Sequence, residues 1–438
     1  MKKFILIVVL IILAFAGYVV YVEVSKNKII PLTIEEEKVE IEEYYIYGTK
    51  LNMKGSLTVE NLSYDNLELV LYNENLKLEK KESNDKKFTN IPIKYEQEGN
   101  TINFYISELI NEGLYLDNIE PGDYTIFIRT THKETVEDEE KITYKYYSLG
   151  NKTEYKETTY YTMNKYNRKI VVNSNNNYNT IMLNITKNQD KLDVYDIVID
   201  PGHGGMDSGA LIENEKESEY TLAISLKLKE RLEKSGLKVI MTRSEDSLTE
   251  KDYFNEYGEG GRAQISHEVY AKYLISIHLN KNTSSNVRGI ELYTPANINY
   301  DFAKDLVERI VNNSSIEYSN RKTYKMFNGV YTHNFTESEI ESSRKNAEEK
   351  GYTPYDITTK SSYLYMIRET GGIMTGAYVD NRNEEQTGND YYNSNIGTES
   401  YLLELSYLSN KNDLTIIKEE QDKYIESIAT SIINSFNK

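Results

Sequence analysis

The chain has 438 residues, a formal net charge of −18 at pH 7 and no cysteine. The acidic charge argues against a nucleic-acid partner, because phosphates need a basic surface. The lack of cysteine excludes disulfides and thiolate metal sites, so any metal must be held by Asp, Glu or the five histidines. The length predicts two folded domains, and the 39% of hydrophobic residues are enough to form real cores.

The N-terminus carries two lysines after Met1, and an uninterrupted apolar run follows over residues 4–22. A helix of about 19 residues spans roughly 30 Å, the thickness of a hydrocarbon core. The lysines predict that this end stays in the cytoplasm. We therefore expect residues 1–22 to form a transmembrane helix that anchors the protein at the cell membrane, with the rest outside. A cleaved signal peptide, which would release the protein, is the alternative.

Residues 23–43 are rich in Glu and Lys and are expected to be a charged linker. Residues 44–187 show short alternating runs, such as residues 124–129 after a Pro-Gly-Asp turn. The 40 tyrosines suit half-buried strands, although compositional bias explains them equally well. This pattern predicts an all-β, sandwich-like domain. It has no metal or nucleophile pattern, and it could bind a protein activator or a partner in the cell-wall machinery.

The pattern changes again over residues 194–438, where apolar strands alternate with helical stretches. The expected strands cover residues 194–200, 239–241, 273–278, 289–293 and 401–408. The expected helices include residues 220–235, 302–311 and 414–436. This alternation predicts an α/β catalytic domain with a largely parallel sheet flanked by helices.

Four ionisable residues occupy comparable places in this domain. His203 follows the first expected strand, His278 ends the third, Glu404 lies in the last, and Glu217 opens the first long helix. Ligands bind at the carboxyl ends of strands in such sheets, and a carboxylate in an apolar strand is costly unless it is paired or metal-bound. Two histidines and a carboxylate are a known catalytic Zn²⁺ set, and a second carboxylate can act as general base. Each residue taken singly also has an ordinary structural interpretation, such as a first-turn acid for Glu217.

Four motifs carry a resemblance to a known family. The string IVIDPGHGG ends at Gly205 and is followed by DSGA, Lys216 precedes Glu217, ISIHLN contains His278, and LEL contains Glu404. Over about residues 194–438 they resemble the zinc-dependent N-acetylmuramoyl-L-alanine amidases, the amidase 3 family. The resemblance implies that His203, Glu217 and His278 bind Zn²⁺ and that Glu404 is the catalytic general base and acid. It also implies that the substrate is peptidoglycan, cut between N-acetylmuramic acid and the L-alanine of the stem peptide. Further residues at family positions are candidates for binding the substrate: Asn280, Arg262, Arg368 and Glu291.

The chain departs from the family pattern in three places. Leu279 stands where the family commonly has alanine, and Ser266-His267 stands where it has Ala-Asn. About thirty polar residues separate Thr370 from the strand of Glu404, and this insertion could border the substrate groove or form a lid. Two other functions remain open from sequence: a non-catalytic wall-binding or regulatory protein on the same fold, and a zinc deacetylase or peptidase that acts on wall material.

Overall fold

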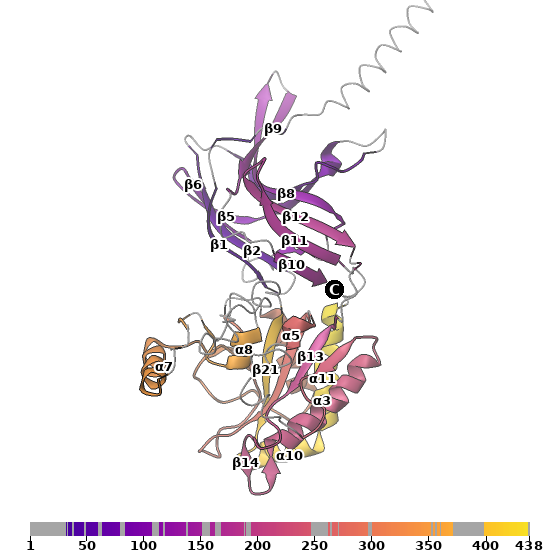
Figure 1. Ribbon diagram of the computed structural model, residues 1–438, viewed down its shortest axis with the longest axis vertical. Helices are drawn as coiled ribbons and strands as arrows, with labels where there is room; N and C mark the ends of the chain where they lie inside the picture. The colour runs from indigo at the N-terminus through magenta and orange to yellow at the C-terminus, as the bar shows by residue number, and fades with distance from the viewer. Residues whose placement is uncertain are drawn as a thin grey trace, which may run out of the picture.

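The computed structural model describes most of the chain between Leu32 and Phe436 (Figure 1). The described residues are 32, 34–36, 39–47, 50–59, 64–78, 84–106, 114–116, 119–136, 139–150, 158–162, 168–187, 189, 194–246, 262, 265–269, 271–296, 300–351, 354, 357–359, 361–370 and 398–436. The predicted anchor at residues 1–22 and the polar insertion at 371–397 lie outside them.

The prediction of a transmembrane helix requires correction. Among the described residues, no helix is both long and apolar enough to cross a membrane. The longest, α3 (Glu217–Glu233), has 17 residues and carries charged side chains along its length, which hydrocarbon does not tolerate. The transmembrane helix and the single-pass location at the cell membrane are corrected on this finding, and the membrane as a partner is not shown. The segment from which they were inferred lies outside the described residues.

The N-terminal β-rich unit consists of two antiparallel sheets that share one core. The first has the order β1-β2-β6-β5 with β7 beside β2, and the second has the order β10-β11-β12-β8-β3-β4 with β9 beside β8. The alternation of TINFYI in β6 buries every second side chain, and these face the other sheet. The elements are β1 (Val39–Tyr47), β2 (Lys50–Thr58), β3 (Asn66–Tyr72), η1 (Asn84–Lys87), β4 (Phe88–Pro92), β5 (Lys94–Glu98), β6 (Thr101–Ile106), β7 (Leu114–Tyr115), β8 (Gly122–Val136), β9 (Glu139–Ser148), β10 (Thr158–Thr162), β11 (Arg168–Asn175) and β12 (Thr180–Lys187). The first strand begins inside the predicted linker.

The C-terminal unit is a sheet with helices on both faces and the strand order β16-β13-β17-β21-β18-β20-β19. Helices α3 and α11 lie on one face and α8 packs on the other (Figure 1), and α6 shares the core of the first face. Its strands are β13 (Ile197–Pro201), β14 (Leu211–Ile212), β15 (Glu215–Lys216), β16 (Val239–Met241), β17 (Tyr273–Asn280), β18 (Glu291–Tyr293), β19 (Lys325–Phe327), β20 (Val330–Tyr331) and β21 (Glu399–Tyr407). Its remaining helices are α5 (Ile265–Glu268), α6 (Asp301–Asn313), α7 (Glu337–Glu349), α8 (Tyr365–Thr370), α10 (Lys411–Glu419) and α11 (Gln421–Phe436).

The sheet is mixed, which corrects the prediction of a largely parallel one. Strands β16, β13, β17 and β21 are parallel neighbours, but β18 runs antiparallel to β21 and β19 runs antiparallel to β20. The reason lies in the connection over residues 281–290, which contains no helix. A crossover between parallel strands needs a dozen or more residues, so this shorter link returns the chain in the opposite direction.

Candidate metal centre

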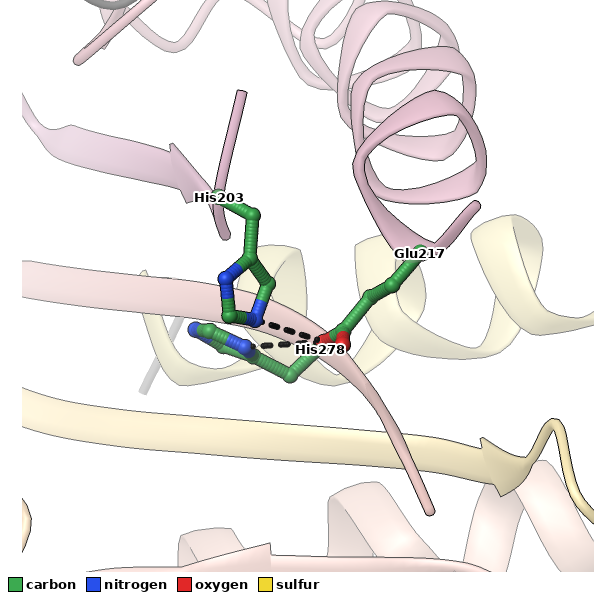
Figure 2. A group of neighbouring side chains, drawn as sticks. All are labelled: His203, Glu217 and His278. Carbon is green, nitrogen blue, oxygen red and sulfur yellow. Dashed lines mark hydrogen bonds and ion pairs between the residues drawn. The ribbon is translucent and has the colours of Figure 1, made fainter. Parts of the chain in front are cut away.

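Three of the predicted residues, His203, Glu217 and His278, come together at one edge of the sheet (Figure 2). One ligand atom from each lies within 4.8 Å of the other two. Oε1 of Glu217 is 3.2 Å from Nε2 of His203 and 3.0 Å from Nδ1 of His278. Metal–ligand bonds of about 2.0–2.1 Å in a tetrahedron place the ligand atoms roughly 3.3 Å apart. The donor types and their spacing therefore fit a small divalent ion such as Zn²⁺.

The fold explains why residues so distant in sequence meet. His203 follows β13 and His278 lies near the end of β17, and these strands are parallel neighbours whose carboxyl ends share an edge. The short β14–β15 hairpin leads directly into α3, so Glu217 begins that helix at the same edge. The backbone N–H groups of Ala210 and Leu279 donate to its two carboxylate oxygens at 2.8 and 2.9 Å. The Glu217 carboxylate is therefore held in place by backbone from two sides.

Glycine and backbone strain allow the two imidazole rings to approach this carboxylate. A Cβ on Gly202 would collide with the His278 ring. Gly209 has φ +62°, and a Cβ there would lie 2.5 Å from Cδ2 of His203 and 2.6 Å from Oε2 of Glu217. His203 itself has φ +60°, a conformation that costs energy for a residue other than glycine and that gathers at functional sites. The backbone of the loop that carries His203 therefore leaves room for both imidazole rings beside the Glu217 carboxylate.

A second layer of side chains orients the His203 loop. Nδ1 of His203 donates to Asp207 at 2.7 Å, which leaves Nε2 of that ring directed at the candidate ion. Arg243 donates to the carbonyl oxygens of Pro201 and Gly202, both at 3.0 Å. Asp207 was not singled out from sequence, although an acid four residues after a candidate ligand was a usable signal.

Arg262, one of the substrate-binding candidates, belongs to this supporting layer in the structure. Its Nε lies 2.9 Å from Oδ1 of Asp200, a fully buried carboxylate, and its Nη2 donates to the backbone oxygen of His203 at 2.9 Å. Burial raises the pKa of Asp200, but the Arg262 charge and the hydroxyls of Ser276 and Thr242 outweigh burial and lower it. Arg262 therefore ties the metal-binding loop to the end of β13.

Glu404 and Glu291 lie side by side but differ in their surroundings. In the sheet register Glu404 is opposite His278 on one side and Glu291 on the other. Oε2 of Glu404 is buried and has no hydrogen-bond partner among the described residues. Glu291 is completely buried, and its oxygens accept from four side chains: Ser319 (2.7 Å), Tyr407 (2.5 Å), Tyr293 (2.8 Å) and Asn280 (3.3 Å). Glu404 is therefore the carboxylate of this pair with an oxygen still able to take a proton.

The pKa values follow from these contacts. Burial lowers the pKa of His203, but Glu217 and Asp207 outweigh it and raise the value to about 9. Burial raises the pKa of Glu217, but hydrogen bonds from both histidines hold it well below its usual range. Burial raises the pKa of Glu404, and the negative charges of Glu217 and Glu291 raise it further. Binding of an ion must displace the His203 proton, so metal uptake is coupled to proton release.

The other two substrate-binding candidates are Asn280, which contacts Glu291, and Arg368, which lies in α8. Asn280 is in β17, two residues after His278, and its Nδ2 donates to Glu291. Arg368 is buried in α8, where Nη1 donates to the backbone oxygens of Ser362 and Tyr363 at 2.9 and 3.1 Å. Arg368 thus fixes the turn that precedes its own helix.

Comparison with known proteins gives a consistent match for the C-terminal unit. A family model described as "N-acetylmuramoyl-L-alanine amidase" matches residues 197–435. A protein of Buchnera aphidicola subsp. Baizongia pistaciae named after the same amidase activity is 29% identical over 219 residues, which are 48% of this chain and 94% of that protein. N-acetylmuramoyl-L-alanine amidase LytC of Bacillus subtilis is 33% identical over 114 residues, 26% of this chain and 21% of LytC. The chain thus spans about a fifth of the length of LytC.

Among solved structures, N-acetylmuramoyl-L-alanine amidase AmiC2 of Nostoc punctiforme is similar with 21% identity and a TM-score of 0.36, over 55% of this chain and 97% of that one. A TM-score this low adds nothing to the sequence match.

Proposed function

Since this chain belongs to the N-acetylmuramoyl-L-alanine amidase family, as predicted from its motifs, we propose that it hydrolyses one bond of bacterial peptidoglycan. That bond is the amide between the lactyl carbonyl of N-acetylmuramic acid and the L-alanine of the stem peptide. The observation that carries the proposal is the convergence of His203, Glu217 and His278 beside Glu404, whose Oε2 has no hydrogen-bond partner in the described part of the chain.

We propose that the ion is Zn²⁺, held by Nε2 of His203, the Glu217 carboxylate and Nδ1 of His278. When bound in such a site, zinc polarises a carbonyl and lowers the pKa of water towards about 7. The protein supplies a rigid cradle: Asp207 fixes the ring of His203, and two backbone N–H groups fix Glu217. These contacts keep the ligand atoms close together before any ion arrives.

Glu404 is the proposed general base and acid. Its Oε2 can accept the proton of the attacking water and deliver it to the nitrogen of the leaving L-alanine. Burial and the negative charges of Glu217 and Glu291 raise the pKa of Glu404, so it holds a proton more readily than an exposed glutamate. Glu291, whose oxygens are occupied by hydroxyl donors, supplies charge and support and does not itself transfer a proton.

We assign the remaining predicted residues roles outside proton transfer and metal binding. Arg262 and Arg368 donate to backbone oxygens near the metal loop and α8, so they act by positioning. Asn280 lies at the edge of the centre, where it can contact substrate. For the β-rich unit we propose a partner or wall contact, because the metal-binding group found among the described residues lies entirely in the α/β unit.

Product analysis tests the proposed reaction. The full chain is incubated with isolated cell wall, with and without a chelator, and the products are identified by mass spectrometry. We expect free lactyl carboxyl groups and peptides that begin with L-alanine, with activity lost on chelation and restored by Zn²⁺. Loss of acetyl groups would indicate a deacetylase, cleavage inside the peptide would indicate a peptidase, and zinc uptake without any product would indicate a non-catalytic wall-binding protein. Each of these outcomes contradicts the proposal.

A further inference from the structure

We propose that Arg321 recognises a carboxylate on the peptide part of the substrate and so selects stem peptides whose second residue carries a free carboxylate. This inference rests on the proposed function and specifies the substrate of the same site. It is carried by the position of Arg321, by the exposure of its guanidinium, and by the rigidity of its loop.

Contacts lead from Arg321 to the catalytic carboxylate. Nη1 of Arg321 donates to the hydroxyl of Tyr293 at 3.1 Å and lies 3.7 Å from Oε2 of Glu291. The Tyr293 hydroxyl in turn donates to Glu291, and Glu291 is the register partner of Glu404. Arg321 therefore lies beside the catalytic centre, on the side opposite His278.

Arg321 keeps part of its guanidinium available. Within the described part of the chain, Nη1 donates to Tyr293, Tyr407 also contacts the guanidinium, and the side chain is 33% exposed. Arg243 shows the contrast, because Nε, Nη1 and Nη2 all donate to protein oxygens and the residue is 7% exposed. Nε and one Nη of a guanidinium form a planar fork that matches the two oxygens of a carboxylate. The exposed part of the Arg321 guanidinium can present such a fork to a substrate.

The charge around the centre makes this fork selective. Glu291 is buried 3.7 Å from Arg321, so an anionic group on the substrate is repelled on this side of the centre unless Arg321 receives it. Burial lowers the pKa of Arg321, but Tyr293, Glu291 and Tyr407 outweigh burial and raise it. The guanidinium is therefore charged throughout the working pH range.

The loop that carries Arg321 is held in a single conformation. Its backbone N–H donates to Ser319 at 3.1 Å, and its carbonyl accepts from Tyr331 at 3.2 Å. Tyr324, three residues on, has φ +61°, and its ring stacks on His333 at a centroid distance of 3.8 Å. A strained backbone persists only where its surroundings over-determine it. Arg321 is thus preorganised, which lowers the entropic cost of binding an anion.

Arg321 lies within reach of a short peptide that leaves the centre at Glu404. Directly opposite residues in an antiparallel pair have Cα atoms about 4.5–5.5 Å apart. Glu291 is the register partner of Glu404, and Nη1 of Arg321 lies 3.7 Å from Oε2 of Glu291, so one strand spacing and one side-chain contact separate Arg321 from Glu404. Two residues of extended chain span about 7 Å. When the scissile amide lies at Glu404, an extended peptide of this length can bring a carboxylate on its second residue to Arg321.

Two matched substrates test this proposal: a muramoyl-L-alanyl dipeptide whose second residue has a free carboxylate, and the same compound as its carboxamide. We expect the wild-type kcat/KM to favour the carboxylate by about 10- to 100-fold, the usual value of a charge-assisted hydrogen bond. Arg321→Gln should abolish this preference by lowering the rate on the carboxylate far more than the rate on the carboxamide, and Arg321→Lys should keep part of it. The control is Arg231→Gln, since Arg231 is equally exposed, at 33%, and pairs with Glu426 on α11.

The outcomes separate the two claims. Equal rates on both substrates in the wild type, or an equal loss on both in Arg321→Gln while its thermal unfolding is unchanged, would overturn carboxylate recognition and leave the amidase reaction standing. Failure of the wild type to release an L-alanyl peptide from either substrate would contradict the proposed function, and the inference would fall with it.

Discussion

Replacing Glu404 by Gln keeps the size of the side chain and removes its ability to take a proton. The residue is not one of the three grouped ligands, so the zinc content should stay at the wild-type level. Positioned acid–base groups contribute about 10²- to 10⁴-fold to rates, and we expect kcat to fall by about that factor with little change in KM. The assay measures release of L-alanyl peptide by zinc-loaded protein, together with metal content.

Retained turnover in Glu404→Gln would refute the assignment of the base. Glu291 would then be the next carboxylate to consider, although Ser319 and Tyr407 already donate to one of its oxygens. A fall in zinc content together with activity would also refute the reasoning, because it would make Glu404 a ligand.

The same variant predicts a pH-dependent gain in stability in metal-free protein. Burial, with the charges of Glu217 and Glu291, raises the pKa of Glu404. A carboxyl whose pKa is higher in the folded state favours folding below its unfolded pKa of about 4.3, and this contribution is lost as the pH rises through the folded value. Glu404→Gln should therefore have a higher Tm than wild type at neutral pH and an equal one near pH 4. A lower Tm at neutral pH would contradict the argument.

Three further changes probe the metal cradle. His278→Ala removes a ligand and should lower both zinc content and activity, so a normal zinc stoichiometry in that variant would reject the assignment. Asp207→Asn weakens the acceptor for Nδ1 of His203 and should reduce metal affinity by about 10- to 100-fold in a chelator competition; unchanged affinity would mean that Asp207 does not orient the ring. Gly209→Ala should lower both metal affinity and stability, because its methyl would lie 2.5 Å from the His203 ring, whereas Gly236→Ala, also at positive φ but with nothing described within 4 Å, should lower stability alone.

Much of the candidate site could be anticipated from local sequence. His203 and His278 were placed at strand ends because each follows a short apolar run, and the structure brings them together with Glu217 as parallel strands require. The direction of β18 was missed, although the signal was present. The link between the expected strands at 273–278 and 289–293 is shorter than the dozen residues that a parallel crossover needs, so its length already favoured an antiparallel return.

Arg321 also escaped sequence analysis, because it lies in a loop with no motif around it. Its position becomes informative only when Tyr293 and Glu291, about thirty residues earlier in the chain, are seen beside it. Arg262 is a different case: it was predicted to bind substrate, and the structure shows it donating to the backbone oxygen of His203, while the substrate contact stays a prediction.

The sequence by itself determined which chemical groups the site contains and in which strands and helices they lie, because hydrophobic periodicity and glycine-rich turns are local properties. The family resemblance implied Glu404 as the base, and only the tertiary structure shows the physical difference between the two carboxylates. Glu291 and Glu404 both lie in apolar strands, but hydroxyls from Ser319 and Tyr407, 28 and 116 residues away from Glu291, occupy one oxygen of the first carboxylate. Hydrogen-bond partners over such separations are set by packing, and no local pattern records them.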